Sequence, residues 1–309
     1  MQRRNFIGSG LAALTAGITV PQAFAQAKEN GQETSADPGA RIPCPISLAQ
    51  WSLRDEFRSG RLKNEDFASF SKNTFGISAV EYVSGFFKDK AKDKSFLKQL
   101  KQNSAIEGVT NVLIMIDGEG SIGAETLAER TQTVENHKKW VEAAQFIGCH
   151  TIRVNAHGTG TEQEQAKQAT DGLRALSTFA SDFGINVVVE NHGGLSSNGQ
   201  WLSKVLADVK MDNCGALPDF GNFGKYDRYQ GIADLMPFAK GVSAKCINFD
   251  KNGNVIETDF AKAMKIVLDT GFRSWVGIEW GGRGATKAIP DIKAAKLLLD
   301  KVQQQYFDY

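Results

Sequence analysis

Carboxylates end three apolar segments in the second half of the chain. The segments are Ile185–Glu190, Cys214–Asp219 and Trp275–Glu279, and Gly241–Cys246 carries Lys245 between the last two. The first segment is short, β-branched and without polar alternation, which is typical of a buried strand in a parallel sheet. Burying a charge at such a place costs several kcal/mol unless a metal, a cation or hydrogen bonds compensate. These acids therefore indicate a functional site.

The chemistry that such acids could perform depends on the positive charge that accompanies them. Clustered carboxylates cannot all stay ionised without a cation. A divalent metal with oxygen ligands, Mg²⁺ or Mn²⁺, would satisfy them, and Lys245 is the other source of positive charge. A glutamate whose pKa is brought near the operating pH can move a proton.

Strands and helices are expected to alternate from Ile46 onward. Expected strands are Ile46–Trp51, Ala79–Val83, Thr110–Ile116, Thr151–Asn155, Ile185–Glu190, Cys214–Asp219, Gly241–Cys246 and Trp275–Glu279. Expected helices are Asn64–Phe75, Asp89–Gln102, Ala124–Phe146, Glu162–Phe183, Trp201–Val209, Ile232–Phe238, Phe260–Leu268 and Ile292–Gln305. Eight such units in about 265 residues predict a single-domain (β/α)₈ TIM barrel. An open doubly wound sheet would usually carry a glycine-rich fingerprint after its first strand, where this chain has Gln50–Arg54.

Side chains that follow barrel strands converge on one pocket. They are Trp51, Glu81, Asp117, Asn155, His157, Glu190, His192, Asp219, Asn222, Ser243, Lys245, Glu279 and Arg283. We expect Trp51 to form a pocket wall on which a sugar ring stacks. We expect His157, His192, Asn222 and Arg283 to contact the substrate, and His137, which lies among charged residues within a helix, to face solvent.

At these positions the chain resembles the xylose isomerase-like barrels known as sugar phosphate isomerases and epimerases. The resemblance covers roughly Ile46–Gln305 and is carried by Val189–His192, Leu217–Phe223, Val242–Lys245 and Gly277–Glu279. In that family a strand-five Glu, a strand-six Asp, a strand-seven His and a strand-eight Glu bind one divalent metal. The two glutamates also move a proton on either face of a carbon beside a carbonyl.

Carried over by position, the resemblance implies that Glu190, Asp219 and Glu279 bind the metal. The strand-seven pattern departs from the family, because Ser243 stands where the family has its metal-binding histidine, while Lys245 remains. Two interpretations stay open. Either the three carboxylates, Ser243 and water hold a divalent metal, or Lys245 supplies the positive charge and the site works without one.

The predicted function is therefore a carbohydrate isomerase or epimerase, or a lyase, that removes a proton beside a sugar carbonyl. Glu190, Glu279 and Lys245 are the expected catalytic residues. One alternative is a glycoside hydrolase that uses paired carboxylates, which would lie about 5–5.5 Å apart in a retaining enzyme and about 6.5–9.5 Å apart in an inverting one. The other is a sugar-binding protein that has lost its chemistry.

The amino terminus has the features of an export signal. Arg3-Arg4 precedes a short apolar stretch, Gly8–Val20, and Ala23-Phe24-Ala25 is a cleavage pattern. We expect a twin-arginine signal peptide over 1–25, a disordered leader over 26–42 and the barrel over 43–309. The protein is then periplasmic, and free of the membrane once the signal is cleaved; an uncleaved anchor is the alternative.

Composition limits the partners. The 309 residues carry a formal net charge of +1 with no basic stripe, so no nucleic-acid partner is expected and a small carbohydrate is the expected ligand. The sequence leaves the oligomeric state open. Four cysteines lie in or beside expected strands, and we expect them to stay free thiols.

Overall fold

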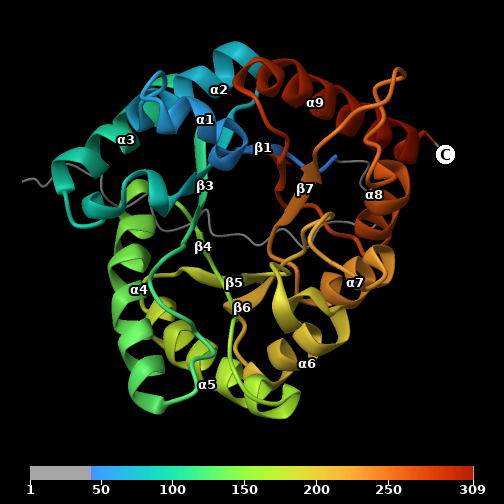
Figure 1. The fold of residues 1–309 in the computed structure, drawn as a ribbon. Helices are drawn as coiled ribbons and strands as arrows, with labels where there is room; N and C mark the ends of the chain where they lie inside the picture. The colour runs from blue at the N-terminus through green and yellow to red at the C-terminus, as the bar shows by residue number, and fades with distance from the viewer. Residues whose placement is uncertain (1–42, 309) are drawn as a thin grey trace, which may run out of the picture. The chain divides into compact units, whose positions relative to one another are not determined.

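The computed structural model describes residues 43–308, which form a parallel eight-stranded sheet surrounded by helices (Figure 1). The strands are β1 (Ile46–Ala49), β2 (Ala79–Val83), β3 (Thr110–Met115), β4 (Thr151–Val154), β5 (Asn186–Glu190), β6 (Cys214–Leu217), β7 (Val242–Cys246) and β8 (Val276–Trp280). The α-helices are α1 (Arg54–Arg58), α2 (Phe67–Phe75), α3 (Lys94–Glu107), α4 (Leu127–Ile147), α5 (Glu162–Ser181), α6 (Gly199–Val209), α7 (Arg228–Leu235), α8 (Phe260–Asp269) and α9 (Ala285–Phe307). The expected signal peptide and leader lie outside the described residues.

The strands follow one another around the sheet in the order β6-β5-β4-β3-β2-β1-β8-β7. Backbone hydrogen bonds close the remaining gap between β6 and β7. Ser243 N donates to Pro218 O at 2.9 Å, Phe220 N to Ser243 O at 3.0 Å, and Lys240 N to Ala216 O at 3.0 Å. The predicted (β/α)₈ TIM barrel is confirmed.

Local sequence signals set the helix ends. Thr126 caps α4 and Thr161 caps α5, each in a reciprocal capping box with the glutamate three residues later. Gly76 and Gly148 end α2 and α4 with positive φ angles of 68° and 86°, a left-handed conformation that glycine adopts without steric cost. Apolar faces of the helices then pack on strands that are buried on both sides.

Several boundaries differ from expectation. β1 ends at Ala49, and the chain turns there into a 3-10 helix, Gln50–Leu53, that leads into α1. β6 ends at Leu217, so Asp219 lies two residues beyond it. The last helix begins at Ala285 rather than Ile292, because Pro290 is accommodated inside α9.

The expectation that His137 faces solvent is wrong. Its side chain is buried, and Nδ1 lies 2.7 Å from the carbonyl oxygen of Thr133. His137 belongs to the buried stripe of α4 together with Trp140 and Val141, because side chains three and four residues apart share a helix face.

The four cysteines are free and buried, as expected: Cys44, Cys149, Cys214 and Cys246. Along residues 43–308 the structure has no helix whose length and apolar character would let it cross a membrane.

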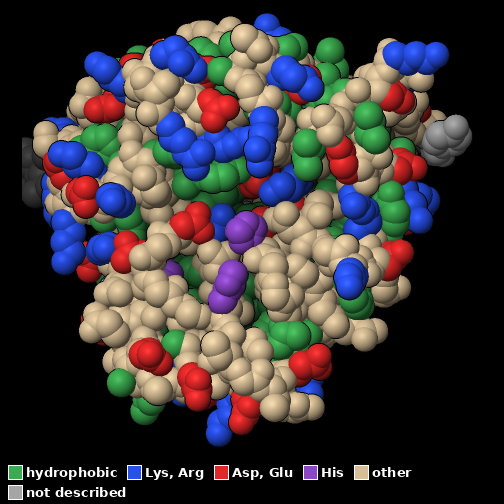
Figure 2. All heavy atoms as spheres, viewed as in Figure 1, with side chains coloured by type: hydrophobic (Ala, Val, Ile, Leu, Met, Phe, Trp, Pro, Cys, Tyr) green, Lys and Arg blue, Asp and Glu red, His purple; other side chains and the backbone are tan. Residues whose placement is uncertain are grey.

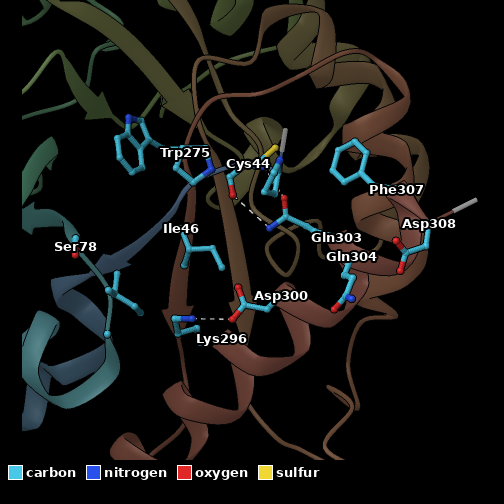
Figure 3. A pocket seen from close by; sticks show the side chains of 14 residues that line it. Cys44, Ile46, Ser78, Trp275, Lys296, Asp300, Gln303, Gln304, Phe307 and Asp308 are labelled. Atoms are coloured by element: carbon cyan, nitrogen blue, oxygen red, sulfur yellow. Dashed lines mark hydrogen bonds and ion pairs between the residues drawn. The ribbon is translucent and has the colours of Figure 1, made fainter. Parts of the chain in front are cut away.

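A hollow of about 710 Å³ opens at the end of the barrel where the strands begin (Figure 3). Its walls include Cys44 and Ile46 at the start of β1, Trp275 just before β8, and Phe307 at the end of α9. The acidic residues predicted to do chemistry follow the opposite ends of the strands. This hollow is therefore separate from the candidate active site.

Candidate active site

Glu190, Asp219 and Glu279 come together at the carboxyl ends of the strands. Each offers one carboxylate oxygen such that the three oxygens lie within 4.8 Å of one another. All three residues are buried, with exposed fractions of 1%, 0% and 4%. Three acids this deep in one barrel can be retained only if cations, protons or hydrogen bonds compensate them.

Glu190 closes β5 and has unequal partners at its two oxygens. Oε1 accepts a hydrogen bond from Asn222 Nδ2 at 2.9 Å. Oε2 lies 2.9 Å from Arg153 Nε, but the N–H is not aimed at it, so neither atom has a hydrogen-bond partner. Burial raises the pKa of Glu190, the Arg153 charge opposes that rise, and Glu279 and Asp219 add to it. Oε2 is thus a buried oxygen with unused lone pairs.

Asp219 is fixed almost completely by its neighbours. Oδ1 accepts from the backbone N–H groups of Gly221 at 2.7 Å and Asn222 at 2.9 Å, and Oδ2 accepts from Ser243 Oγ at 2.7 Å. The Asn191 side chain binds the backbone of Asp219, because Nδ2 donates to Asp219 O and Oδ1 accepts from Asp219 N. Burial raises the pKa of Asp219, while Lys245 is the largest influence that lowers it. The hydroxyl that replaces the family histidine therefore orients an acid.

Lys245, on β7, is the cation nearest Glu279. Its Nζ lies 2.7 Å from Glu279 Oε1. Burial lowers the pKa of the ammonium, but Asp219 and Glu279 outweigh this effect and the pKa is raised overall. The acids beside Lys245 therefore favour its charged form.

Arg153 is a second cation of the site; it is buried, and it was not among the residues expected from the sequence. It projects from within β4, and its Nη1 donates to Asp117 Oδ1 at 2.8 Å while Nε faces Glu190. Asn155 also donates to Asp117 Oδ1, at 2.9 Å. The sequence does give one hint: Arg153 is the single charged residue in the strand Thr151–Val154. A charged side chain is rarely buried in a strand unless it has a partner.

Glu81 occupies the barrel interior beneath the three acids. Ser47 Oγ donates to its Oε1 at 2.6 Å, and its Oε2 has no hydrogen-bond partner. Gly277 leaves room for it, since a Cβ there would lie 2.3 Å from Oε1. Burial raises the pKa of Glu81 to about 7, against the lowering effect of Ser47.

The residues expected to bind substrate differ in how close they lie to the three acids. Trp51 is half-buried in the 3-10 helix after β1. His192 lies just after β5 with part of its side chain exposed. Partial desolvation lowers the pKa of His192, and the nearby charges of Arg153 and Lys245 lower it further. Asn222 contacts Glu190 directly. Arg283 is exposed beyond β8. The hydrogen bonds of His157 involve its backbone carbonyl, which joins its loop to Gly123 at 3.0 Å, and none of them leads to the acids.

The donor set fits a divalent metal. It offers three carboxylates, a partnerless buried oxygen on Glu190, and the Ser243 hydroxyl, which suits hard cations such as Mg²⁺ or Mn²⁺. Glu81, Asp117, Glu190, Asp219 and Glu279 lie in and around the cluster, and two cations, Arg153 and Lys245, form ion pairs with members of this group. One oxygen from each carboxylate lies within 4.8 Å of the others, which is shorter than the separation of about 6.5–9.5 Å in inverting glycosidases and close to the 5–5.5 Å of retaining ones.

Fold and site together define a (β/α)₈ barrel with a buried acidic centre at the carboxyl ends of its strands. The xylose isomerase-like TIM barrel family matches residues 73–302. The chain belongs to this family. No curated protein matches the sequence.

Solved structures share the fold at low sequence identity. The IolI protein with a bound zinc atom is 14% identical, with a TM-score of 0.69 over 86% of this chain and 100% of that one. The 3-keto-D-glucoside 4-epimerase YcjR from E. coli is 14% identical, with a TM-score of 0.63 over 84% and 99%. The probable 3-DHS dehydratase AsbF from Bacillus anthracis is 16% identical, with a TM-score of 0.64 over 82% and 98%. Identities this low establish the shared fold alone.

Proposed function

We propose that the protein is a sugar isomerase, epimerase or lyase that removes a proton from a carbon beside a sugar carbonyl. The observation that carries the proposal is the cluster of three buried carboxylates with Lys245 2.7 Å from one of them. Similar barrels are described as an epimerase of a keto-glucoside and a probable dehydratase. Both reactions can begin with proton removal beside a carbonyl.

Glu190 and Glu279 are the proposed proton-transfer residues. They come from β5 and β8, so they can approach a bound sugar from different directions. The raised pKa of Glu190 suits a group that must both take and return a proton near neutral pH. Asn222 holds one Glu190 oxygen at 2.9 Å and leaves the other for chemistry. Lys245 is placed to stabilise negative charge that develops on the substrate oxygen.

A divalent ion held by Glu190, Asp219 and Glu279 is part of the proposal. When bound, it would polarise the carbonyl and stabilise the enediolate. Ser243 orients Asp219 through its 2.7 Å hydrogen bond, and Arg153 pairs with Glu190 and Asp117. Together these contacts hold the acids in place before substrate arrives.

Solvent deuterium exchange tests the proposed proton transfer. The protein, supplied with Mg²⁺ or Mn²⁺, is incubated in D₂O with a panel of free, oxidised and keto sugars, and NMR detects deuterium at carbons beside the carbonyl. We expect exchange with at least one sugar and its loss in Glu190→Gln and Glu279→Gln. The control is Glu135→Gln, which changes a glutamate on the solvent side of α4 paired with Lys138. Tight sugar binding without exchange would instead indicate a binding protein.

We also propose that residues 1–25 direct export by the twin-arginine route. Arg3-Arg4 and the Ala23-Phe24-Ala25 pattern support this interpretation. Replacing both arginines with lysine should leave the protein in the cytoplasmic fraction and uncleaved. Unchanged appearance of the mature variant in the periplasmic fraction would reject this part of the proposal.

A further inference from the structure

Three arginines and a tryptophan lie on one side of the active-site mouth. We call Arg54, Arg58 and Arg283 the arginine rim. Arg54 and Arg58 belong to α1, which follows the 3-10 helix containing Trp51. Arg283 follows β8 and lies near enough to Arg54 for its charge, like that of Arg58, to add to the lowering of the Arg54 pKa that burial causes. The guanidinium carbons of Arg54 and Arg58 lie 5.5 and 5.1 Å from the centre of the Trp51 ring. Figure 2 shows Lys and Arg side chains gathered over α1, beside the central hollow of that face.

Arg54 anchors the rim to the active site. It is 8% exposed and donates to the carbonyl oxygens of Trp280 at 3.1 Å, Gly281 at 3.4 Å and Gly282. Trp280 is the residue directly after Glu279, and a Cβ on Gly281 would lie 3.4 Å from Lys245 Cε. Arg54 of the arginine rim is therefore bonded to the residue that follows Glu279 of the acidic cluster.

None of the three rim arginines has a carboxylate partner among the described residues. Within residues 43–308, Arg54 hydrogen-bonds only backbone carbonyls, and Arg58 and Arg283 form neither ion pairs nor hydrogen bonds. Both of these are exposed. Arg61, three residues after the end of α1, differs because its Nε lies 2.7 Å from Glu56 Oε2. Arg58 and Arg283 thus keep all their donors for a ligand.

The site is therefore polarised. Its floor carries Glu81, Glu190, Asp219 and Glu279, and its rim carries unpaired guanidinium groups. An anionic group on a ligand would be repelled by the floor and attracted by the rim. Guanidinium groups bind carboxylates and phosphates through two parallel hydrogen bonds, and the aromatic ring of Trp51 beside them suits contact with a sugar.

We propose that Arg58 and Arg283, supported by Arg54, form a subsite for the anionic group of an acidic sugar, which orients the sugar carbonyl toward Glu190 and Glu279. This inference rests on the proposed function in assuming a sugar ligand. A carboxylate and a phosphate share the required chemistry, and the experiment below separates them.

Calorimetric titration at low salt tests the subsite. The probes are D-glucose, D-glucuronate and D-glucose 6-phosphate. We expect one anionic probe to bind at least about tenfold more tightly than glucose, a ratio typical of one charge-assisted pair. The tighter of the two identifies the anion. Arg58→Gln/Arg283→Gln should remove the preference, and 0.5 M salt should weaken it.

The matched control is Arg61→Gln, which removes an exposed arginine from the same region that already has a carboxylate partner. It should keep the preference for the anionic probe. Equal binding of all three probes, absence of anionic binding, or a preference that survives the double variant would each overturn the proposal.

The readout is binding, so its failure is distinguishable from failure of the proposed function. Deuterium exchange in neutral sugars with no anionic preference would reject the subsite alone. Arginine-dependent binding of an acidic sugar, with no exchange in any sugar, would reject the proton-transfer function alone.

Discussion

Arg153 Nε lies 2.9 Å from Glu190 Oε2, and the same guanidinium donates to Asp117 at 2.8 Å. One buried arginine therefore joins an acid of β5 to an acid that follows β3. The pairing matters because Glu190 is 1% exposed and would otherwise carry its charge beside Asp219 and Glu279. Arg153 therefore balances negative charge in the cluster and also links Glu190 to Asp117.

Replacing Arg153 with glutamine should destabilise the protein strongly. Breaking a buried ion pair by removing one partner leaves an uncompensated charge, at a cost of about 3–5 kcal/mol. Urea unfolding should show this loss in the free energy of unfolding. Arg61→Gln is the control, because Arg61 is exposed and its hydrogen bonds go only to the Glu56 carboxylate; it should change little. A fully stable Arg153→Gln variant would contradict this account.

Metal content is the second prediction. The purified protein should carry close to one Mg²⁺, Mn²⁺ or similar ion per chain, removable by chelator, and mass spectrometry of the metals measures it. Asp219→Asn should lose the ion, because it removes charge from a fully buried member of the cluster. Glu81→Gln should keep it, since Glu81 is a buried acid of the same barrel outside the three-carboxylate cluster. Retention of the ion by Asp219→Asn would place it elsewhere.

The sequence predicts the barrel well because each strand and helix carries its own local signal. The three clustered acids are also predictable, since residues after successive barrel strands must converge. Arg153 was not predicted, because an arginine within a short strand can point to either face of the sheet, and only the structure shows that this one reaches Glu190. The charges near His137 suggested exposure, but the buried spacing of Thr133, Trp140 and Val141 decides its face.

The stability of the protein should depend on pH through Glu81. The ordinary pKa of 4.5 is raised to about 7 in the folded protein, first by burial. Between these pH values the folded chain keeps a proton that the unfolded chain has lost. Protonated Glu81 therefore adds to the free energy of unfolding in full below pH 4.5. This stabilisation, about 3 kcal/mol, disappears as pH rises through 7. Glu81→Gln should flatten this part of the unfolding profile, and an unchanged slope would refute it.

The fit between Glu81 and Gly277 gives a coupled prediction. A Cβ at position 277 would lie 2.3 Å from Glu81 Oε1, so Gly277→Ala should cost about 1–3 kcal/mol through overpacking. In a Glu81→Ala background the same change should cost much less, because the carboxyl group is gone. A double-mutant cycle of unfolding free energies measures the coupling. Additive costs would mean that the two side chains do not share this space.

Lys245→Met separates the two interpretations of the active site. Lys245 pairs with Glu279 at 2.7 Å and is not among the three metal-ligand candidates. If a metal balances the acids, the variant should keep its ion and its fold. Its turnover of the sugar found by deuterium exchange should fall by about 10²–10³, the usual cost of losing one group that stabilises developing charge. Lys265→Met, which breaks an exposed pair with Asp269, should leave turnover and stability unchanged. If no metal is used, chelators should have no effect, and Lys245→Met should destabilise the fold by about 3–5 kcal/mol because buried Glu279 loses the cation paired with it. We expect the first outcome, and a metal-free, chelator-resistant and active enzyme would make Lys245 the group that stabilises the enediolate.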